Sequence, residues 1–202
     1  MAKPAPTSVS NLATLRSNLA PALRPLRARL EILGRWRRRL RYFRDGIEGI
    51  AMELRCAIDC VPILREYGAS VGEGCTITGP LHIMNADRDF SRLHIGDRVY
   101  IGTDFLIDLA DTVSIGDDCS LGMRSSLITS FDVGEGPLKA RRPRRQGPIR
   151  IEAGTYIGTA ATVLHGVTIG AEATIGAHCL VNRDVPAGAT YVSPLAKPFE
   201  RA

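Results

Sequence analysis

Residues 151–181 read IEAGTYIGTAATVLHGVTIGAEATIGAHCLV, and this stretch decides the fold. Its aliphatic residues recur at six-residue spacing, at positions Ile151, Ile157, Val163, Ile169, Ile175 and Val181. Neither an α-helix nor a simple alternating strand has this period, whereas a three-sided solenoid of short strands places one aliphatic side chain per side against its axis. The pattern therefore predicts stacked coils that share one narrow core.

The same pattern of an aliphatic residue followed by glycine extends toward the N-terminus. Earlier examples are Val71-Gly72, Ile95-Gly96, Ile101-Gly102, Ile115-Gly116 and Leu121-Gly122. We expect these glycines to adopt the unusual backbone conformations that corner turns need. Aromatic residues make up only 5% of the chain, which suits a core of small repeated units.

Three motifs in this region carry a resemblance to a known family. They read TVLHGVTIG (residues 162–170), IGAHCLVNRDVP (175–186) and VSPLAKP (192–198). Over roughly residues 71–200 the chain resembles the hexapeptide-repeat acyltransferases, including the maltose, galactoside and colanic-acid O-acetyltransferases. The resemblance implies a left-handed parallel β-helix over residues 71–202 and a homotrimer with active sites between neighbouring subunits. It also implies direct transfer of an acyl group from CoA to a hydroxyl or amine, without a metal. Among these reactions we expect O-acetyl transfer from acetyl-CoA to a saccharide or saccharide-lipid hydroxyl.

The segment that carries the family's catalytic histidine reads LITSFDVG here, at residues 127–134, and contains no histidine. In that family the histidine acts as a general base toward the acceptor. Relatives with a Thr-His-x-Asp-Val-Gly pattern align it with Ser130, and other registers move it to Phe131, Asp132 or Val133. A sequence of this family without that histidine needs either another base or a function other than catalysis.

His165 is the candidate replacement for the missing base. It stands where the family usually has proline in its Leu-Pro-Gly-Val-Thr-Ile-Gly turn. If Val163 stacks on Leu127, His165 lies one coil above Thr129 and beside Ser130, because neighbouring strands are about 4.8 Å apart. We therefore predict a catalytic group of His165, Ser130 and Asp132, with Asp132 orienting the imidazole. The alternative is a solvent-facing turn histidine without a role.

Further site residues follow from the resemblance. Asp108 matches an aspartate that contacts the acceptor sugar in the family, although a turn aspartate that bonds nearby amides is an equal alternative. The residues that match positions along the CoA arm are Thr159, Ala177, Asn182, Arg183 and Lys197. The loop at residues 139–145 carries five cations, and it suits the phosphates of CoA, an anionic acceptor or contact with an adjacent subunit.

The N-terminal part of the chain has a different composition. We expect residues 1–10 to be disordered and residues 11–70 to form a basic helical extension, with continuous helix only after Pro21 and Pro25. An apolar stripe at helical spacing comprises Ile32, Trp36, Leu40, Phe43, Ile47 and Leu54. Arginines occupy the other directions. This helix suits packing within its own protein, anionic lipid headgroups or, least, nucleic acid, for which no recognition fold is present.

Charge and cysteine content narrow the protein class. The formal net charge is +5, yet residues 1–44 hold eleven Lys/Arg against one acid, so the remainder is mildly acidic. The five cysteines form no C-x-x-C pair and indicate buried reduced thiols in a cytoplasmic protein. The most apolar segment, residues 46–64, is interrupted by charges and predicts neither a signal peptide nor a transmembrane helix.

Two classes of function fit these observations. The first is a CoA-dependent acyltransferase that works at the cytoplasmic side, with peripheral contact to the inner membrane surface through the basic helix. The second is a catalytically silent β-helix scaffold, a partner-binding or membrane-binding subunit, which the absent histidine favours. Four scattered histidines without a metal-binding pattern disfavour a metal-dependent member of the fold.

Overall fold

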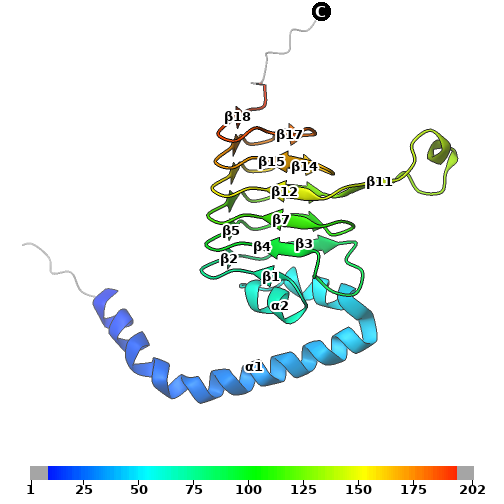
Figure 1. Cartoon of the computed structure of the whole chain (residues 1–202). Coiled ribbons are helices and arrows are strands. Elements are labelled where there is room, and N and C mark those ends of the chain that lie inside the picture. The colour runs from blue at the N-terminus through cyan, green and yellow to red at the C-terminus, as the bar shows by residue number, and fades with distance from the viewer. Residues whose placement is uncertain (1–8, 195–202) are drawn as a thin grey trace, which may run out of the picture. The chain divides into compact units, whose positions relative to one another are not determined.

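The computed structural model describes residues 9–194, with side chains from residue 32 onward. Most of its secondary-structure elements are β-strands. Short parallel strands lie in three sheets that form the sides of a left-handed parallel β-helix (Figure 1). The first sheet contains β1 (Ser70–Val71), β4 (Leu93–Ile95), β7 (Val113–Ile115), β12 (Ile149–Ile151) and β15 (Thr168–Ile169). The second contains β2 (Thr76–Ile77), β5 (Tyr100–Ile101), β8 (Ser120–Leu121), β13 (Tyr156–Ile157), β16 (Thr174–Ile175) and β18 (Thr190–Tyr191). The third contains β3 (Leu81–Met84), β6 (Phe105–Asp108), β9 (Ser126–Ile128), β14 (Thr162–Leu164) and β17 (Leu180–Val181).

The register between coils agrees with the spacing of the aliphatic residues. Ile151 pairs with Ile115, and Val163 pairs with Leu127, which in turn pairs with Ile107. All of these side chains are buried in one continuous hydrophobic core. The predicted β-helix and the predicted stacking of Val163 on Leu127 are therefore confirmed.

The glycine that follows each aliphatic residue serves a different purpose from the one we expected. Gly96 has no positive φ, and a Cβ there would collide with the Asp117 side chain and backbone of the next coil. The left-handed conformation instead falls two residues later, on non-glycine residues such as Arg98 (φ 54°) and His178 (φ 58°). Glycine is thus required by the close approach of stacked corners, because no side-chain atom fits between them.

The helix α1 (Val9–Leu54) begins before both prolines and includes them, whereas we expected continuous helix only after Pro25. Helix can accommodate the φ of proline, at the loss of one backbone hydrogen bond for each. Val9 and Ser10, which we expected to be disordered, belong to this helix, and residues 1–8 lie outside the described residues. No helix of the described part of the chain is long and apolar enough to cross a membrane.

The apolar stripe of α1 divides at Gly46, where a positive φ of 64° interrupts the helical backbone. Residues 1–44 form one compact unit and residues 45–202 another. In the first unit the exposed side chains include Ile32, Leu33, Trp36, Leu40 and Phe43, the last 91% exposed. In the second, Ile47 and Leu54 are buried in the core. The single predicted stripe is therefore exposed before Gly46 and buried in the core after it.

Residues 45–70, which we expected to belong to the helical extension, pack in the same compact unit as the β-helix. The end of α1 and the short helix α2 (Val61–Glu66) bury Ile50, Leu54 and Leu64 in the core of the solenoid. A stack of coils exposes apolar side chains at its end, and a helical segment with an apolar face covers them. These residues act as a cap for the first coil.

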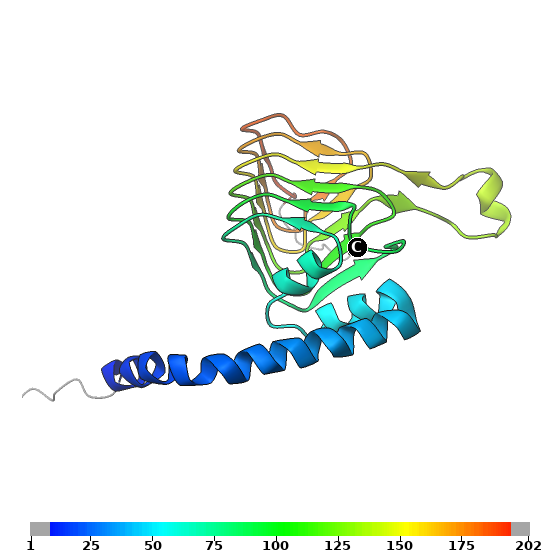
Figure 2. The same cartoon turned by 60° about the horizontal axis from the view of Figure 1, so that its bottom comes forward.

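The longest excursion from the regular coils in the described part of the chain lies between β9 and β12. The strands β10 (Ser130–Phe131) and β11 (Arg145–Gln146) form a two-stranded antiparallel ribbon, with the 3-10 helix η1 (Pro137–Ala140) at its tip. Figure 2 shows this ribbon projecting away from the β-helix. Its base lies beside the segment in which the family's histidine is missing.

Candidate active site

Asp108 is the most enclosed charged residue of the candidate site. It closes β6 and is only 3% exposed. Its Oδ1 atom accepts hydrogen bonds from Asn85 Nδ2 at 2.7 Å and from the Ala110 N–H at 3.1 Å. Its Oδ2 atom accepts a hydrogen bond from Ser130 Oγ at 2.6 Å. A buried carboxylate is stable only with such partners.

The pKa of Asp108 lies below its usual value. Burial by itself raises that pKa, since it disfavours the charged form, but the hydrogen bonds outweigh it. The donors that lower the pKa are, in order, Ser130, Asn85 and the backbone N–H of Ala110. Asp108 is therefore an anion at neutral pH and is better suited to hold a donor than to remove a proton.

Ser130 occupies the position where one family register has the histidine. Its hydroxyl donates to Asp108, so it has a structural partner on the coil below. The neighbouring Thr129 is fully buried, and its Oγ1 donates to the Asp108 carbonyl at 2.9 Å and accepts from the Asp111 N–H. These bonds fix the end of β9 against the end of β6 and orient the base of the ribbon.

His165 follows β14 and is partly buried. It borders a hollow of about 150 Å³ whose other lining residues are Phe131, Arg142, Pro143 and Arg145. The structure therefore brings His165 to the base of the basic ribbon, and β14 lies directly against β9. Sequence reasoning anticipated this proximity from the six-residue period alone.

Asp132 is exposed and lies outside the lining of that hollow. Its Oδ1 atom accepts a hydrogen bond from the Gly134 N–H at 2.8 Å, within its own turn. Aspartate commonly stabilises turns in this way. The orienting role expected for Asp132 stays a prediction.

The residues expected along the CoA arm lie on one corner of the β-helix and beyond it. Thr159 and Ala177 are exposed, and the pairing of Ile157 with Ile175 places them at the same corner of successive coils. Asn182 and Arg183 are exposed and follow β17, the strand that pairs with β14. Lys197 lies outside the described residues. Thr159 and Ala177 thus lie at the corner before the third sheet, and Asn182 and Arg183 lie at the corner after it.

Asn85 is the site residue that sequence reasoning missed. It follows β3 with a positive φ of 56°, a conformation that asparagine tolerates better than most residues. Its amide reaches Asp108 because Met84 pairs with Asp108 in the register of β3 and β6. The sequence contains this asparagine 23 residues before the aspartate. That spacing indicates a contact only once the length of the coil between the two residues is known.

Burial makes two of the cysteines poor nucleophiles. Burial raises the pKa of Cys60 to about 12, with the charge of Asp59 adding to the effect, and burial also raises the pKa of Cys119. All five thiols are free, but Cys56 is exposed and Cys75 half-buried, which corrects the expectation that all are buried. Among the described residues no cluster of His, Cys, Asp and Glu could hold a metal ion.

Comparison with known families and proteins agrees with this architecture. The family profile described as "Bacterial transferase hexapeptide (six repeats)" matches residues 148–183, and "Hexapeptide repeat of succinyl-transferase" matches residues 112–136. Nodulation protein L of Rhizobium meliloti is 35% identical over 135 residues, which are 66% of this chain and 71% of that protein. Galactoside O-acetyltransferase of Escherichia coli is 28% identical over 61% of this chain. This chain spans 59% of the length of that enzyme.

Solved structures share the fold. A galactoside acetyltransferase in complex with coenzyme A superposes with a TM-score of 0.63 at 23% identity, covering 72% of this chain and 74% of that one. A hexapeptide-repeat acetyltransferase from Vibrio cholerae, complexed with acetyl coenzyme A, superposes with a TM-score of 0.61 at 23% identity. It covers 71% of this chain and 78% of that one.

Fold and register together define a left-handed β-helix protein with a ribbon inserted between coils and a polar cluster at the base of that ribbon. The sequence relationships specify the class further. The chain belongs to the bacterial hexapeptide-repeat transferase family.

Proposed function

We propose that this chain is a CoA-dependent O-acetyltransferase whose acceptor is a hydroxyl of a saccharide or saccharide-lipid. Its similarity to galactoside O-acetyltransferases supports the reaction class. The observation that carries the proposal is the Asp108 cluster. A carboxylate has about four acceptor sites, and the described hydrogen bonds from Asn85, Ala110 and Ser130 use three of them. The remaining site suits an acceptor hydroxyl.

In this reaction the thioester of acetyl-CoA supplies the acetyl group. The acceptor oxygen attacks the carbonyl carbon, the new C–O bond forms and the C–S bond breaks. His165 takes the proton of the acceptor hydroxyl and returns it to the leaving thiolate, so that protons balance over one turnover. Ser130 and Asp108, on the two coils before that of His165, are proposed to hold the acceptor, and Asp132 is the group proposed to orient the imidazole.

Thr159 and Ala177 are proposed to contact the pantetheine arm through their exposed backbone groups, with Asn182 and Arg183 toward the nucleotide. The common corner of Thr159 and Ala177 supports this assignment, because an extended arm needs a track that continues from one coil to the next. The proposed contribution of Lys197 concerns a residue outside the described part of the chain. Arg183→Gln should raise KM for acetyl-CoA, whereas Arg98→Gln should not, since Arg98 pairs with Asp118 on another corner.

The decisive experiment measures release of CoA thiol from acetyl-CoA in the presence of a panel of saccharides and saccharide-lipids. We expect acceptor-dependent release together with an O-acetylated product detected by mass spectrometry. Binding of CoA without turnover of any acceptor would favour a catalytically silent scaffold. Absence of CoA binding would remove both the proposed reaction and the proposed cofactor track.

We further propose that the protein is a homotrimer with sites between subunits, as the resemblance to its family implies. The half-enclosed position of His165, at a surface hollow with two arginines, supports a site that a neighbouring subunit completes. Light scattering should give a trimer at micromolar protein concentration. A monomer under these conditions would contradict this assembly.

A second proposed property is peripheral binding of the first unit to the cytoplasmic face of an anionic membrane. Trp36 and Phe43 are exposed on α1, and at 100° per residue Arg35 and Arg37 flank their stripe on opposite sides. Interfacial helices combine such a stripe with flanking cations. The full chain should sediment with phosphatidylserine vesicles and a chain without residues 1–44 should not. Equal sedimentation of both would contradict lipid binding by this helix.

A further inference from the structure

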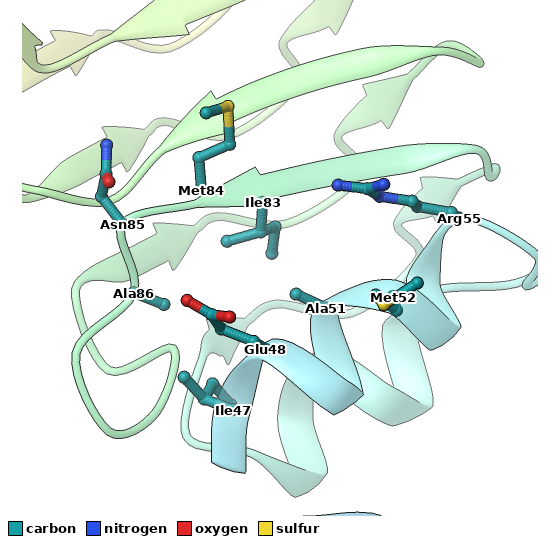
Figure 3. Close-up of a pocket in the computed structure, with 9 residues that line it drawn as sticks. All are labelled: Ile47, Glu48, Ala51, Met52, Arg55, Ile83, Met84, Asn85 and Ala86. Atoms are coloured by element: carbon teal, nitrogen blue, oxygen red, sulfur yellow. The ribbon is translucent and has the colours of Figure 1, made fainter. Parts of the chain in front are cut away.

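A pocket of about 300 Å³ lies beside the Asp108 cluster, within the unit of residues 45–202. One wall is the end of α1, with Ala51 and Met52, and the other is the end of β3 and the turn after it, as Figure 3 shows. This volume is at the lower end of the range for pockets that hold small molecules. A pocket of this size suits one substituent of a ligand better than a whole ligand.

The lining of this pocket is mostly apolar. Ile47, Ala51 and Ile83 form its floor and are buried, while Met52 and Met84 are 62% and 48% exposed at its mouth. Methionine is flexible and polarizable, so it adapts to apolar groups of different shape. The charged lining residues Glu48 and Arg55 are exposed and lie on the helix side.

Asn85 connects this pocket with the Asp108 cluster. Its side chain belongs to the pocket lining, and its Nδ2 atom donates to Asp108 at 2.7 Å. Met84 of the same wall pairs in register with Asp108, so the two residues are neighbours on adjacent strands. A ligand whose hydroxyl reaches Asp108 therefore has an apolar surface within reach beside Asn85.

We propose that this pocket binds an apolar substituent of the acceptor, an alkyl or aryl group attached beside the hydroxyl that receives the acyl group. The inference rests on the proposed acyl transfer and narrows its acceptor to amphiphilic hydroxyl compounds. A plain hydrophilic sugar would leave the methionines in contact with water. An acceptor with an apolar arm covers them and places its polar part at Asn85 and Asp108.

The test compares methyl, butyl and hexyl β-D-glucopyranosides and the corresponding galactosides as acceptors. These compounds share the reacting hydroxyls and differ only in the apolar arm. We expect kcat/KM to rise up to roughly fourfold for each methylene that leaves water, since one buried methylene contributes about 0.8 kcal/mol. Equal kcat/KM for methyl and hexyl acceptors would overturn the inference while leaving the proposed acetyl transfer intact.

Two variants locate the effect. Met52→Ser and Met84→Ser should each lower the hexyl-to-methyl ratio of kcat/KM several-fold, because they replace apolar lining with a hydroxyl. Ile58→Ser is the matched control, since Ile58 is 89% exposed and lies outside the pocket lining. An unchanged ratio in both methionine variants, or an equal loss in the control, would overturn the assignment to this pocket.

Calorimetric titration of the glycosides in the absence of acetyl-CoA separates this inference from the proposed reaction. If no glycoside is turned over, the proposed acetyl transfer to these compounds is wrong. Tighter binding of the hexyl than of the methyl glycoside, with the difference lost in Met52→Ser, would still support apolar binding in this pocket. Equal binding of both glycosides would overturn the pocket without reference to activity. Acetyl transfer and apolar binding are thus measured by different signals.

Discussion

The Asp108 cluster and the hollow beside His165 both lie at the ends of strands of the third sheet but differ in exposure and in the charges around them. Asp108 is 3% exposed and bonded to Ser130, Asn85 and Ala110. The hollow is lined by two arginines and a proline of the ribbon together with Phe131 and the partly buried His165. The first region holds a buried anion, and the second is a surface hollow that carries two cations.

This difference bears on the missing family histidine. Ser130 follows β9, one coil above Asp108 on β6, and His165 follows β14, one coil further on. The Ser130 hydroxyl donates to Asp108 and helps to hold it ionised. In the proposed mechanism Asp108 and Ser130 bind the acceptor and His165 transfers the proton, so substitutions at these positions test the two roles separately.

The largest effect should follow removal of His165. A positioned general base contributes roughly 10² to 10⁴-fold to turnover, so His165→Ala should lower kcat by about that factor with little change in CoA affinity. His165→Pro, which restores the usual turn residue, should fold and be equally inactive. Steady-state kinetics with a verified acceptor provide the measurement.

The matched control for this prediction is His178→Ala, at the exposed left-handed corner of a later coil. It should retain activity. Ser130→His in the His165→Ala background tests whether the site accepts a base on the lower coil, and we expect partial recovery of turnover. Near-normal turnover of His165→Ala itself would reject the relocated base.

Asp108→Asn should have an intermediate effect, because it removes the charge from a buried network. We expect a loss of about 1–3 kcal/mol in the free energy of unfolding at pH 7, measured by urea titration. The folded-state pKa of Asp108 is below the unfolded value, so its stabilisation is present above about pH 4–5 and is lost as pH falls toward the folded pKa. The difference in the free energy of unfolding between wild type and Asp108→Asn should therefore become smaller as the pH falls. A constant gap down to low pH would show that shape, not charge, matters at this position.

The arginines of the hollow should have a smaller effect, since exposed ion pairs contribute about 0.2–1 kcal/mol each. Arg142→Gln and Arg145→Gln should each raise KM for acetyl-CoA up to about fivefold at low salt, and high salt should reduce the difference. Arg144→Gln is the control, because Arg144 is exposed in the same ribbon and absent from the hollow. If only the KM of a phosphorylated acceptor changes, the ribbon contacts the acceptor instead.

The smallest effect on the β-helix should follow deletion of residues 1–44. The core is built from residues 47 onward, so the remaining unit should unfold within a few degrees of the full chain in a thermal scan. Deletion to residue 60 is the contrasting variant. It also removes Ile50 and Leu54 from the cap, and should lower the midpoint clearly. Similar midpoints for both deletions would show that the cap contributes little.

The fold was predictable from the sequence because a period of six leaves few alternatives. Six aliphatic residues at that spacing specify three sides and the register between their coils, which the pairings of Ile151 with Ile169 and of Val163 with Val181 confirm. The reason for the glycines was not predictable from one coil. Gly96 is required by Asp117 of the following coil, and a contact between coils has no signature in the local sequence. The division of α1 at Gly46 was not predictable for a similar reason. An apolar stripe on a helix does not indicate which of its residues will pack in the core.

The candidate site follows the same distinction. By itself the sequence determined that Asp108, Ser130 and His165 lie near one another, because strand register converts sequence spacing into position. Only the tertiary structure decided that Ser130 donates to Asp108, that Asn85 completes the cluster and that Asp132 bonds within its own turn. Hydrogen bonds of this kind depend on rotamers and loop conformations, and these are set by the packing of neighbouring coils rather than by the period of the repeat.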